Sequence, residues 1–111
     1  MVEVKYKVWI EKDGEIVMGL GRDELLREIE KTGSIKKSAE KIGISYRKAL
    51  YFIDAMEKRY GKKIVESVRG GRGGGGSKLT EEGKKLLKEF EKVIKEFEKA
   101  KENSEKELNV E

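Results

Sequence analysis

Apolar and polar side chains alternate along the beginning of the chain. Over residues 2–11 the even positions are apolar or aromatic, while the odd positions, apart from Trp9, are charged. A period of two with β-branched and aromatic residues predicts a half-buried strand. Asp13-Gly14 suits the positive φ angles of a type I′ turn, so residues 15–19 are expected to return as a second strand. Trp9 lies on the polar side of this predicted hairpin, where it would cover a neighbouring helix or a partner subunit, or pack over its own domain.

Three helical segments follow the hairpin, and each ends at a glycine. Asp23 and Glu24 favour the start of the first helix, because acidic side chains interact well with the helix dipole. Ser34 and Ser45 are good N-caps for the second and third helices. The glycines that end the three helices are Gly33, Gly43 and Gly61. In the third helix, spacings of three and four predict an inward stripe, which consists of Tyr46, Ala49, Leu50, Ile53, Met56 and Tyr60.

A second hairpin and a long helix complete the pattern. Residues 64–68 predict a strand, residues 70–76 are glycine apart from Arg72, and residues 77–79 can form a returning strand. Thr80 caps a last helix whose apolar residues step alternately by three and four, as in a coiled-coil seam. Such a seam favours contact with another helix, and its candidate interface residues are Leu86, Phe90, Val93, Ile94 and Phe97. The helix is expected to fray after about residue 101.

Composition excludes many kinds of active site. The chain has 111 residues and no His, Cys or Pro, which allows one domain with a small core. Without Cys there is no disulfide framework or thiolate metal site, and without His there is no imidazole catalysis or His-bound zinc. The acidic pair Glu81 and Glu82 is explained by the dipole of the last helix. No catalytic residue, metal ligand or cofactor is therefore predicted, and an enzyme is not expected.

Two further features of composition concern the protein's surroundings. No run approaches the roughly 20 apolar residues that a membrane span needs, and the N-terminus lacks the apolar region of a signal peptide. A cytoplasmic protein without membrane contact is therefore expected. Gln is absent, only Asn103 and Asn109 carry side-chain amides, and Lys and Glu dominate. This bias is typical of a thermophile proteome.

Positive charge is concentrated in the middle of the chain, although the net charge is only +4. Residues 34–80 carry 12 basic and 4 acidic side chains, whereas the segments before and after them each have a net charge of −2. A Lys-rich surface exposed to water would also produce such a block. The positive charges of residues 34–80 fall on particular elements, however, and this placement indicates a nucleic-acid partner.

Residues 34–61 have the pattern of a helix-turn-helix, in which two helices are joined by a short turn that contains glycine. A recognition helix needs long donors at its N-terminal end, because that end enters the major groove. Arg can bond guanine bidentately, and Lys can reach a base edge or a phosphate. The DNA-binding residues predicted here are Ser34, Ser45, Tyr46, Arg47, Lys48 and Tyr51. Tyr46 fits the core equally well, since it also belongs to the inward stripe.

The glycine run is not surrounded by the residues of a P-loop or of a dinucleotide-binding unit. Arg69, Arg72 and Lys78 flank or interrupt it, and residues 67–80 contain no acidic side chain. A glycine-rich hairpin tip lets the backbone approach a sugar-phosphate chain, and an arginine there can enter the minor groove. We interpret residues 64–79 as a wing in which Arg69, Arg72 and Lys78 bind DNA.

The helix-turn-helix and the wing together resemble a known family. The segments that carry the resemblance are Ser34-Ile35, Gly43-Ile44-Ser45-Tyr46-Arg47, Ala49, Ile53, Met56, Val65-Glu66, the wing tip from Gly70 to Gly76, Leu79-Thr80 and Gly83. They look like the DNA-binding domain of the molybdate-responsive ModE regulators, over about residues 20–90. More distantly the layout is similar to LysR-type regulators. The resemblance implies a winged helix-turn-helix that binds operator DNA as a dimer through its long helices.

One feature of the ModE family is not expected here. Its oxyanion-binding domains follow the DNA-binding part, whereas this sequence stops at Glu111. A stand-alone DNA-binding form without molybdate sensing is therefore expected. Any effector would act through a separate effector-sensing protein or through an unrecognised site.

The predicted protein is a single α+β winged-helix domain over residues 1–111. Its parts are a β-hairpin (1–19), the helix-turn-helix and wing (22–79), a dimerisation helix (80–101) and a frayed tail (102–111). The hypothesis for function is a homodimeric transcription regulator that binds double-stranded DNA sequence-specifically at a pseudo-palindromic operator. The alternative is a protein-interaction module of the same fold that binds another protein through its C-terminal helix.

Overall fold

The computed structural model of the protein describes residues 2–69 and 75–110. Within them lie two antiparallel hairpins and four helices: β1 (Trp9–Lys12), β2 (Glu15–Gly19), α1 (Arg22–Thr32), α2 (Ile35–Ile42), α3 (Tyr46–Tyr60), β3 (Val65–Val68), β4 (Gly76–Leu79) and α4 (Glu81–Glu107). The α+β fold, with its N-terminal hairpin, helix-turn-helix, second hairpin and long last helix, is confirmed. None of the helices in these residues is both long and apolar enough to cross a bilayer.

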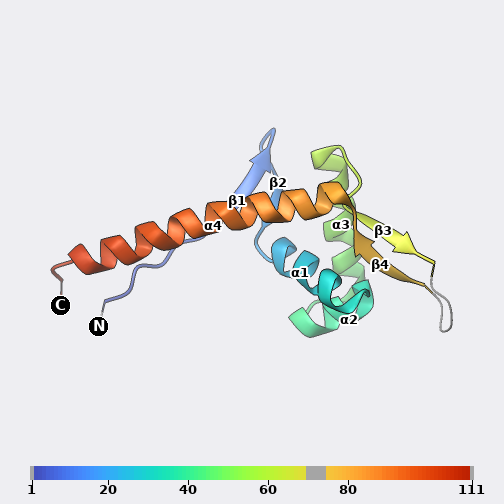
Figure 1. Ribbon diagram of the computed structural model, residues 1–111, viewed down its shortest axis with the longest axis horizontal. Helices are drawn as coiled ribbons and strands as arrows, with labels where there is room; N and C mark the ends of the chain where they lie inside the picture. Colours follow the sequence, from blue (N-terminus) through green and yellow to red (C-terminus); the bar gives the residue numbers. More distant parts are fainter. Residues whose placement is uncertain (1, 70–74, 111) are drawn as a thin grey trace.

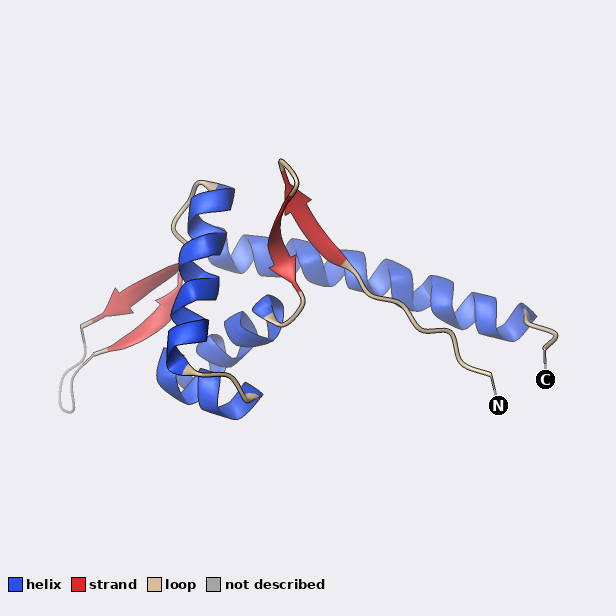
Figure 2. Ribbon diagram, turned by 180° about the vertical axis from the view of Figure 1, so that it is seen from behind, coloured by secondary structure: helices blue, strands red, loops and turns tan. Residues whose placement is uncertain are grey.

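The molecule is elongated, with principal extents of 59 × 30 × 22 Å. Strands β3 and β4 project at one end of the long axis, and both chain termini lie near its other end (Figure 1). Helix α4 runs along most of this length, with α1, α2 and α3 grouped beside its first half (Figure 2). The fold therefore separates the helix-turn-helix and the second hairpin from the far end of α4.

The N-terminal hairpin is shorter than the alternating pattern predicts. Strand β1 begins only at Trp9, although Val4, Tyr6 and Val8 are half-buried and the residues between them are exposed, as expected. Asp13 and Gly14 have φ angles of 53° and 81°, which agrees with the predicted turn. The predicted alternation of buried and exposed side chains is therefore correct. The predicted strand is wrong for residues 2–8, because they lie extended against α4 instead of pairing with β2.

Contacts with this extended segment also explain why α4 is longer than predicted. The Val4 amide donates a hydrogen bond to Glu105 Oε2 (2.8 Å), and the Tyr6 hydroxyl donates one to Glu98 Oε1 (2.6 Å). Lys101 Nζ lies 2.9 Å from Glu105 Oε2, and the pKa of Glu105 is lowered by Lys101 and by the Val4 amide. The predicted fraying after about residue 101 is wrong, since α4 continues to Glu107.

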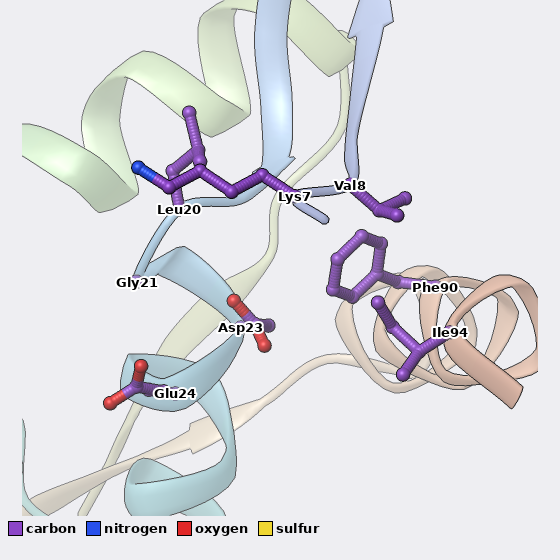
Figure 3. A pocket seen from close by; sticks show the side chains of 8 residues that line it. All are labelled: Lys7, Val8, Leu20, Gly21, Asp23, Glu24, Phe90 and Ile94. Carbon is purple, nitrogen blue, oxygen red and sulfur yellow. The ribbon is translucent and has the colours of Figure 1, made fainter. Parts of the chain in front are cut away.

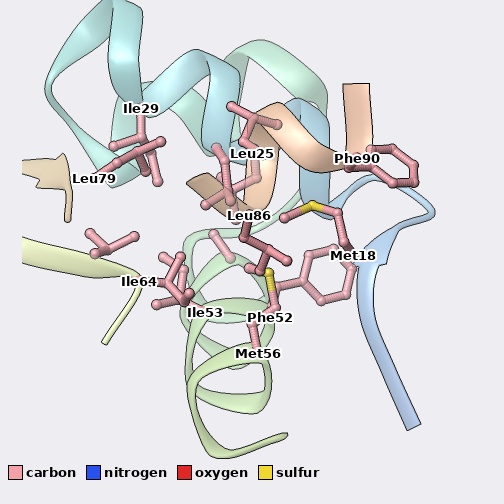
Figure 4. Close-up of a cluster of buried hydrophobic side chains, with 14 of the residues drawn as sticks. Met18, Leu25, Ile29, Phe52, Ile53, Met56, Ile64, Leu79, Leu86 and Phe90 are labelled. Atoms are coloured by element: carbon pink, nitrogen blue, oxygen red, sulfur yellow. The ribbon is translucent and has the colours of Figure 1, made fainter. Parts of the chain in front are cut away.

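One hydrophobic core joins all the helices and both hairpins (Figure 4). Its buried residues include Met18 of β2, Leu25 and Ile29 of α1, Met56 of α3, and Phe90 of α4. The inward stripe that the sequence predicts for α3 is only partly correct. Phe52 is buried, whereas Tyr46 and Leu50 are 49% and 40% exposed. Because α3 packs against β2 as well as α1 and α2, its buried face is rotated toward Phe52.

Three of the helix starts are capped as the sequence predicts. The side-chain oxygens of Ser34, Ser45 and Thr80 accept hydrogen bonds from the backbone N–H groups of Lys37, Lys48 and Gly83. Gly33, Gly43 and Gly61 follow the ends of α1, α2 and α3 with positive φ angles. Local sequence signals therefore determine where these helices begin and end.

Candidate nucleic-acid interface

The turn between α2 and α3 is held by backbone hydrogen bonds and by a glycine. The Ile44 amide donates to the Ala39 carbonyl (3.0 Å), and the Gly43 amide donates to the Glu40 carbonyl (3.2 Å). Gly43 has a φ of 79°, a left-handed conformation that glycine adopts without strain. Ala39 is only 1% exposed, so α2 and α3 approach closely there. These features fix the angle at which α3 is presented.

A buried hydroxyl network fixes α2 relative to α1. Ser38 is fully buried, and its Oγ donates to the Ser34 carbonyl (2.7 Å). The same Oγ lies 2.8 Å from Thr32 Oγ1 at the end of α1. Because a buried hydroxyl without partners is costly, this arrangement favours one geometry for the two helices.

The first turns of the helices differ in charge. Helices α1 and α4 carry acidic pairs there, Asp23-Glu24 and Glu81-Glu82, as the helix dipole favours. Helices α2 and α3 carry no acidic residue in the first turn. They carry two basic residues each, and these are Lys36, Lys37, Arg47 and Lys48. Basic groups at a helix N-terminus oppose the dipole, so the helix-turn-helix gains no stability from them.

The four basic side chains also lack acidic partners in the structure. Other lysines close in sequence are paired, such as Lys41 with Glu28 (3.2 Å) and Lys58 with Asp54 (3.1 Å). In residues 2–69 and 75–110, no carboxylate lies within 4.0 Å of the charged groups of Lys36, Lys37, Arg47 or Lys48. Their charge is available to an external anion.

The predicted recognition residues gather at the start of α3. Tyr46, Arg47, Lys48 and Tyr51 are all exposed. The Lys48 ammonium lies 5.6 Å from the centre of the Phe52 ring, on one flank of the helix. Tyr46, which fitted both the core and the DNA-binding face in sequence, is 49% exposed and lies outside the core.

A shallow hollow connects α2, α3 and the base of the second hairpin. Its lining residues are Ser34, Ile35, Lys36, Tyr46, Gly75, Gly76 and Ser77. Sequence reasoning singled out Ser34 and Tyr46 but missed Lys36. The signal that would have found it is a lysine in the first turn of a helix, where an acidic residue is the rule.

The second hairpin is held firmly against the helix-turn-helix. The Ser77 amide donates to the Gly33 carbonyl (2.9 Å), and a Cβ on Gly76 would lie only 2.5 Å from the same oxygen. Arg69 is exposed where β3 ends. Lys78 is exposed on β4 and pairs across the hairpin with Glu66 (3.4 Å). The predicted contact residue Arg72, like the rest of residues 70–74, lies outside the described residues.

The residues predicted for the dimer interface divide into two groups. Leu86 and Phe90 are 6% and 1% exposed and belong to the core of their own chain. They are therefore occupied within the monomer, because the first half of α4 covers α1 and β2. Val93 and Ile94 are half-buried, and Phe97 is 46% exposed beyond the core. Only the second half of the predicted seam is accessible.

Another hollow lies between the N-terminal segment, the start of α1 and α4 (Figure 3). Phe90, Ile94 and Val8 form its apolar side, and the carboxylates of Asp23 and Glu24 stand opposite. Asp23 is already paired with Arg27 at 2.7 Å. The acidic side chains make this hollow unsuitable for a nucleic-acid backbone.

The arrangement of α1, α2 and α3, followed by the β3–β4 hairpin, defines a winged helix-turn-helix protein. The family model of bacterial regulatory helix-turn-helix proteins of the lysR family matches residues 22–84. This match covers more than half of the chain and runs from α1 to the first turn of α4. The chain belongs to this lysR family.

The chain is also similar to ModE proteins, as its motifs indicate. It is 43% identical to the transcriptional regulator ModE of Yersinia pestis over 63 residues, which are 57% of this chain and 24% of that protein. It is 41% identical to the DNA-binding transcriptional dual regulator ModE of Escherichia coli over 63 residues, with the same shares of 57% and 24%.

A third relative matches over more of the chain. The molybdenum-pterin-binding protein MopB of Rhodobacter capsulatus is 35% identical over 94 residues, which are 85% of this chain and 35% of that protein. The chain thus spans about a quarter to a third of the length of these relatives.

Proposed function

We propose that this protein is a transcription regulator that binds double-stranded DNA sequence-specifically as a homodimer. The observation that carries the proposal is the pair of basic helix starts in α2 and α3. These four cations oppose the helix dipoles and have no acidic partner in the described residues, so binding a polyanion would relieve an unfavourable local arrangement.

Each part of the interface has a role that follows from its chemistry. Tyr46, Arg47, Lys48 and Tyr51 would enter the major groove, since they are exposed at the N-terminal end of α3. Ser45 caps this helix beside them, and its exposed position would bring it close to the DNA.

Neighbouring groups would hold the DNA backbone. Ser34 and Lys36 line the hollow between α2, α3 and β4, where a phosphate would meet the first turn of α2. Arg69, Arg72 and Lys78 would bind phosphates or the minor groove from the wing. Lys78 would have to exchange its ion pair with Glu66 for a phosphate, a small loss because exposed pairs contribute little.

The relatives support a regulatory role. Two of them are named as transcriptional regulators, and the name of one includes DNA binding. The segment that the lysR family model matches, residues 22–84, contains the basic helix starts. The cytoplasm is the compartment in which such a regulator would act.

We propose that the dimer forms through the second half of α4. Val93, Ile94 and Phe97 are the accessible part of the seam, and Phe97 keeps 46% of its surface exposed although it is apolar. Pairing of these helices would set two recognition helices against two half-sites. A pseudo-palindromic operator follows from that symmetry.

The experiment is the selection of bound sequences from a random duplex pool, followed by binding measurements on the selected site at several salt concentrations. A sequence with two inverted half-sites is expected. If the dimer neutralises roughly 6–10 phosphates, its affinity falls by about 10³–10⁵-fold between about 50 and about 200 mM salt. No enrichment, or binding with little salt response, would favour the alternative of a protein-interaction module that uses its C-terminal helix.

Arg47 tests the assignment within the recognition helix. Arg47→Ala is expected to weaken binding to the selected site by about 1–3 kcal/mol and to relax the preference at one base pair. Lys106→Ala is a matched control, because it also removes one exposed positive charge, in the distant last turn of α4. An equal loss of affinity on selected and random DNA would show that Arg47 contacts a phosphate instead of a base.

A further inference from the structure

The recognition helix exposes an aliphatic side chain that the hydrophobic pattern assigns to the core. Leu50 keeps 40% of its surface exposed, next to Tyr51 at 58%. Leu50 is the fifth residue of α3, in the same part of the helix as Arg47 and Lys48. The exposed part of this leucine lies among cations, where a binding partner that covers it would gain apolar contact.

The position of Leu50 on α3 follows from helix geometry. It lies one turn after Tyr46 and Arg47, so the three side chains share one side of the helix. Glu57 lies two turns further along the same row, and its Oε2 accepts hydrogen bonds from the amides of Ile64 (2.9 Å) and Val65 (3.2 Å). The Glu57 end of this row therefore faces the start of β3, and Leu50 lies in the same row next to Tyr46 and Arg47.

The surroundings of Leu50 select the kind of partner. The nearby basic residues Arg47, Lys48 and Lys36 complement a polyanion, and no carboxylate neutralises them in the described residues. In the major groove, the edges of the base pairs present hydrogen-bonding groups with one apolar exception, the C5-methyl group of thymine. A leucine has no hydrogen-bonding group, so the methyl group is the base-edge feature that it can distinguish.

We propose that Leu50 is a specificity-determining residue that packs against the C5-methyl group of a thymine in each half-site. The proposal rests on the proposed DNA-binding function and adds to it the identity of one base. It predicts a thymine at a fixed position of the half-site, next to the base pairs contacted by Arg47.

The test removes the methyl group and the leucine separately. Duplexes carrying the selected site are prepared with each thymine replaced in turn by 2′-deoxyuridine, which lacks only the methyl group. At one position per half-site, the replacement is expected to weaken binding of the wild-type protein by about fourfold, the effect of one buried methyl group. Leu50→Ala is expected to weaken binding to the thymine duplex and to lose this sensitivity at that position.

Two further variants control the comparison. Leu50→Met keeps an apolar side chain of similar size and should retain the sensitivity to the methyl group. Leu108→Ala removes a leucine that is 42% exposed at the far end of α4, and it should bind both duplexes like the wild type. Circular dichroism of Leu50→Ala establishes that the variant is folded.

The outcomes separate this inference from the proposed function. If the protein selects a symmetric site but wild type and Leu50→Ala respond equally to every uracil replacement, the thymine contact is refuted and the regulator remains. The same holds if the selected site has no thymine in the half-site, or if Leu50→Ala loses stability without any change in sequence preference. If no sequence is selected, the proposed function fails and the inference fails with it.

Discussion

Gly83 is the position at which a single added methyl group should disturb the relation between α4 and the wing. It lies in the first turn of α4 and is buried against the residue that precedes β3. A Cβ at this position would overlap the Ile64 carbonyl oxygen and would lie 3.2 Å from Ile64 Cγ2. The same carbonyl accepts a hydrogen bond from the Thr80 amide (2.9 Å), so it cannot move away without losing that bond. We predict that Gly83→Ala destabilises the protein.

Two opposing effects determine the magnitude. Alanine is favoured over glycine inside a helix by about 1 kcal/mol. Overpacking against a buried backbone group costs about 1–3 kcal/mol and sometimes more, and weakening the hydrogen bond at Ile64 adds about 1 kcal/mol. The net loss of unfolding free energy is therefore expected to be about 1–3 kcal/mol. For a domain of this size, each kcal/mol lowers Tm by about 4–8 °C.

Urea and thermal unfolding followed by circular dichroism measure the effect. Asn103→Ala is the matched control, because Asn103 is exposed on the same helix and its replacement changes little besides helix propensity. The control should be neutral or slightly stabilised. If Gly83→Ala is as stable as the wild type, or more stable, the close packing of α4 on Ile64 does not limit the fold and the reasoning is wrong.

Three more perturbations address the helix-turn-helix, the dimer and the N-terminal segment. Ser38→Ala removes a buried hydroxyl that joins α1 to α2, and should lower the unfolding free energy by about 1–3 kcal/mol in urea titrations; an unchanged midpoint would show that the network is dispensable. Phe97→Glu places a charge in the accessible seam of α4 and should shift light scattering toward the monomer mass, whereas an unchanged mass would exclude this seam from the interface. The hydrogen bond from Tyr6 to Glu98 raises the pKa of Tyr6 from 10.0 to about 12, so its stabilising contribution is present below about pH 10 and is lost as the pH rises through about 12. Phenolate absorbance during an alkaline titration should show a component with this high pKa in the wild type that is missing in Tyr6→Phe.

Local sequence signals predicted the helix-turn-helix well. The hydroxyl caps at Ser34, Ser45 and Thr80 and the left-handed glycines that end the helices depend only on neighbouring residues, so they can be recognised in the sequence. The helix boundaries near these signals agree closely with the structure. The resemblance to the ModE regulators rests on the same region and is confirmed by the comparisons.

Predictions that depended on distant partners succeeded less well. The strand predicted for residues 2–11 is mostly an unpaired extended segment, because α4 supplies the apolar surface that a neighbouring strand would otherwise provide. The end of α4 was predicted too early for the same reason, since Lys101 and Glu105 are stabilised by contacts with residues about a hundred positions earlier. Amphipathic periodicity cannot reveal such contacts.

The sequence by itself determined the order of the elements, the basic middle of the chain and the chemistry of the side chains at the start of α3. These properties follow from spacing, capping and charge, which act over a few residues. The tertiary structure decided which sides of the helices are buried. It rotated α3 so that Phe52 is covered and Leu50 exposed, and it placed Leu86 and Phe90 in the core while leaving Phe97 accessible. The physical reason is that burial depends on which elements pack on each side of a helix, and a periodic pattern determines a stripe only to within about one residue.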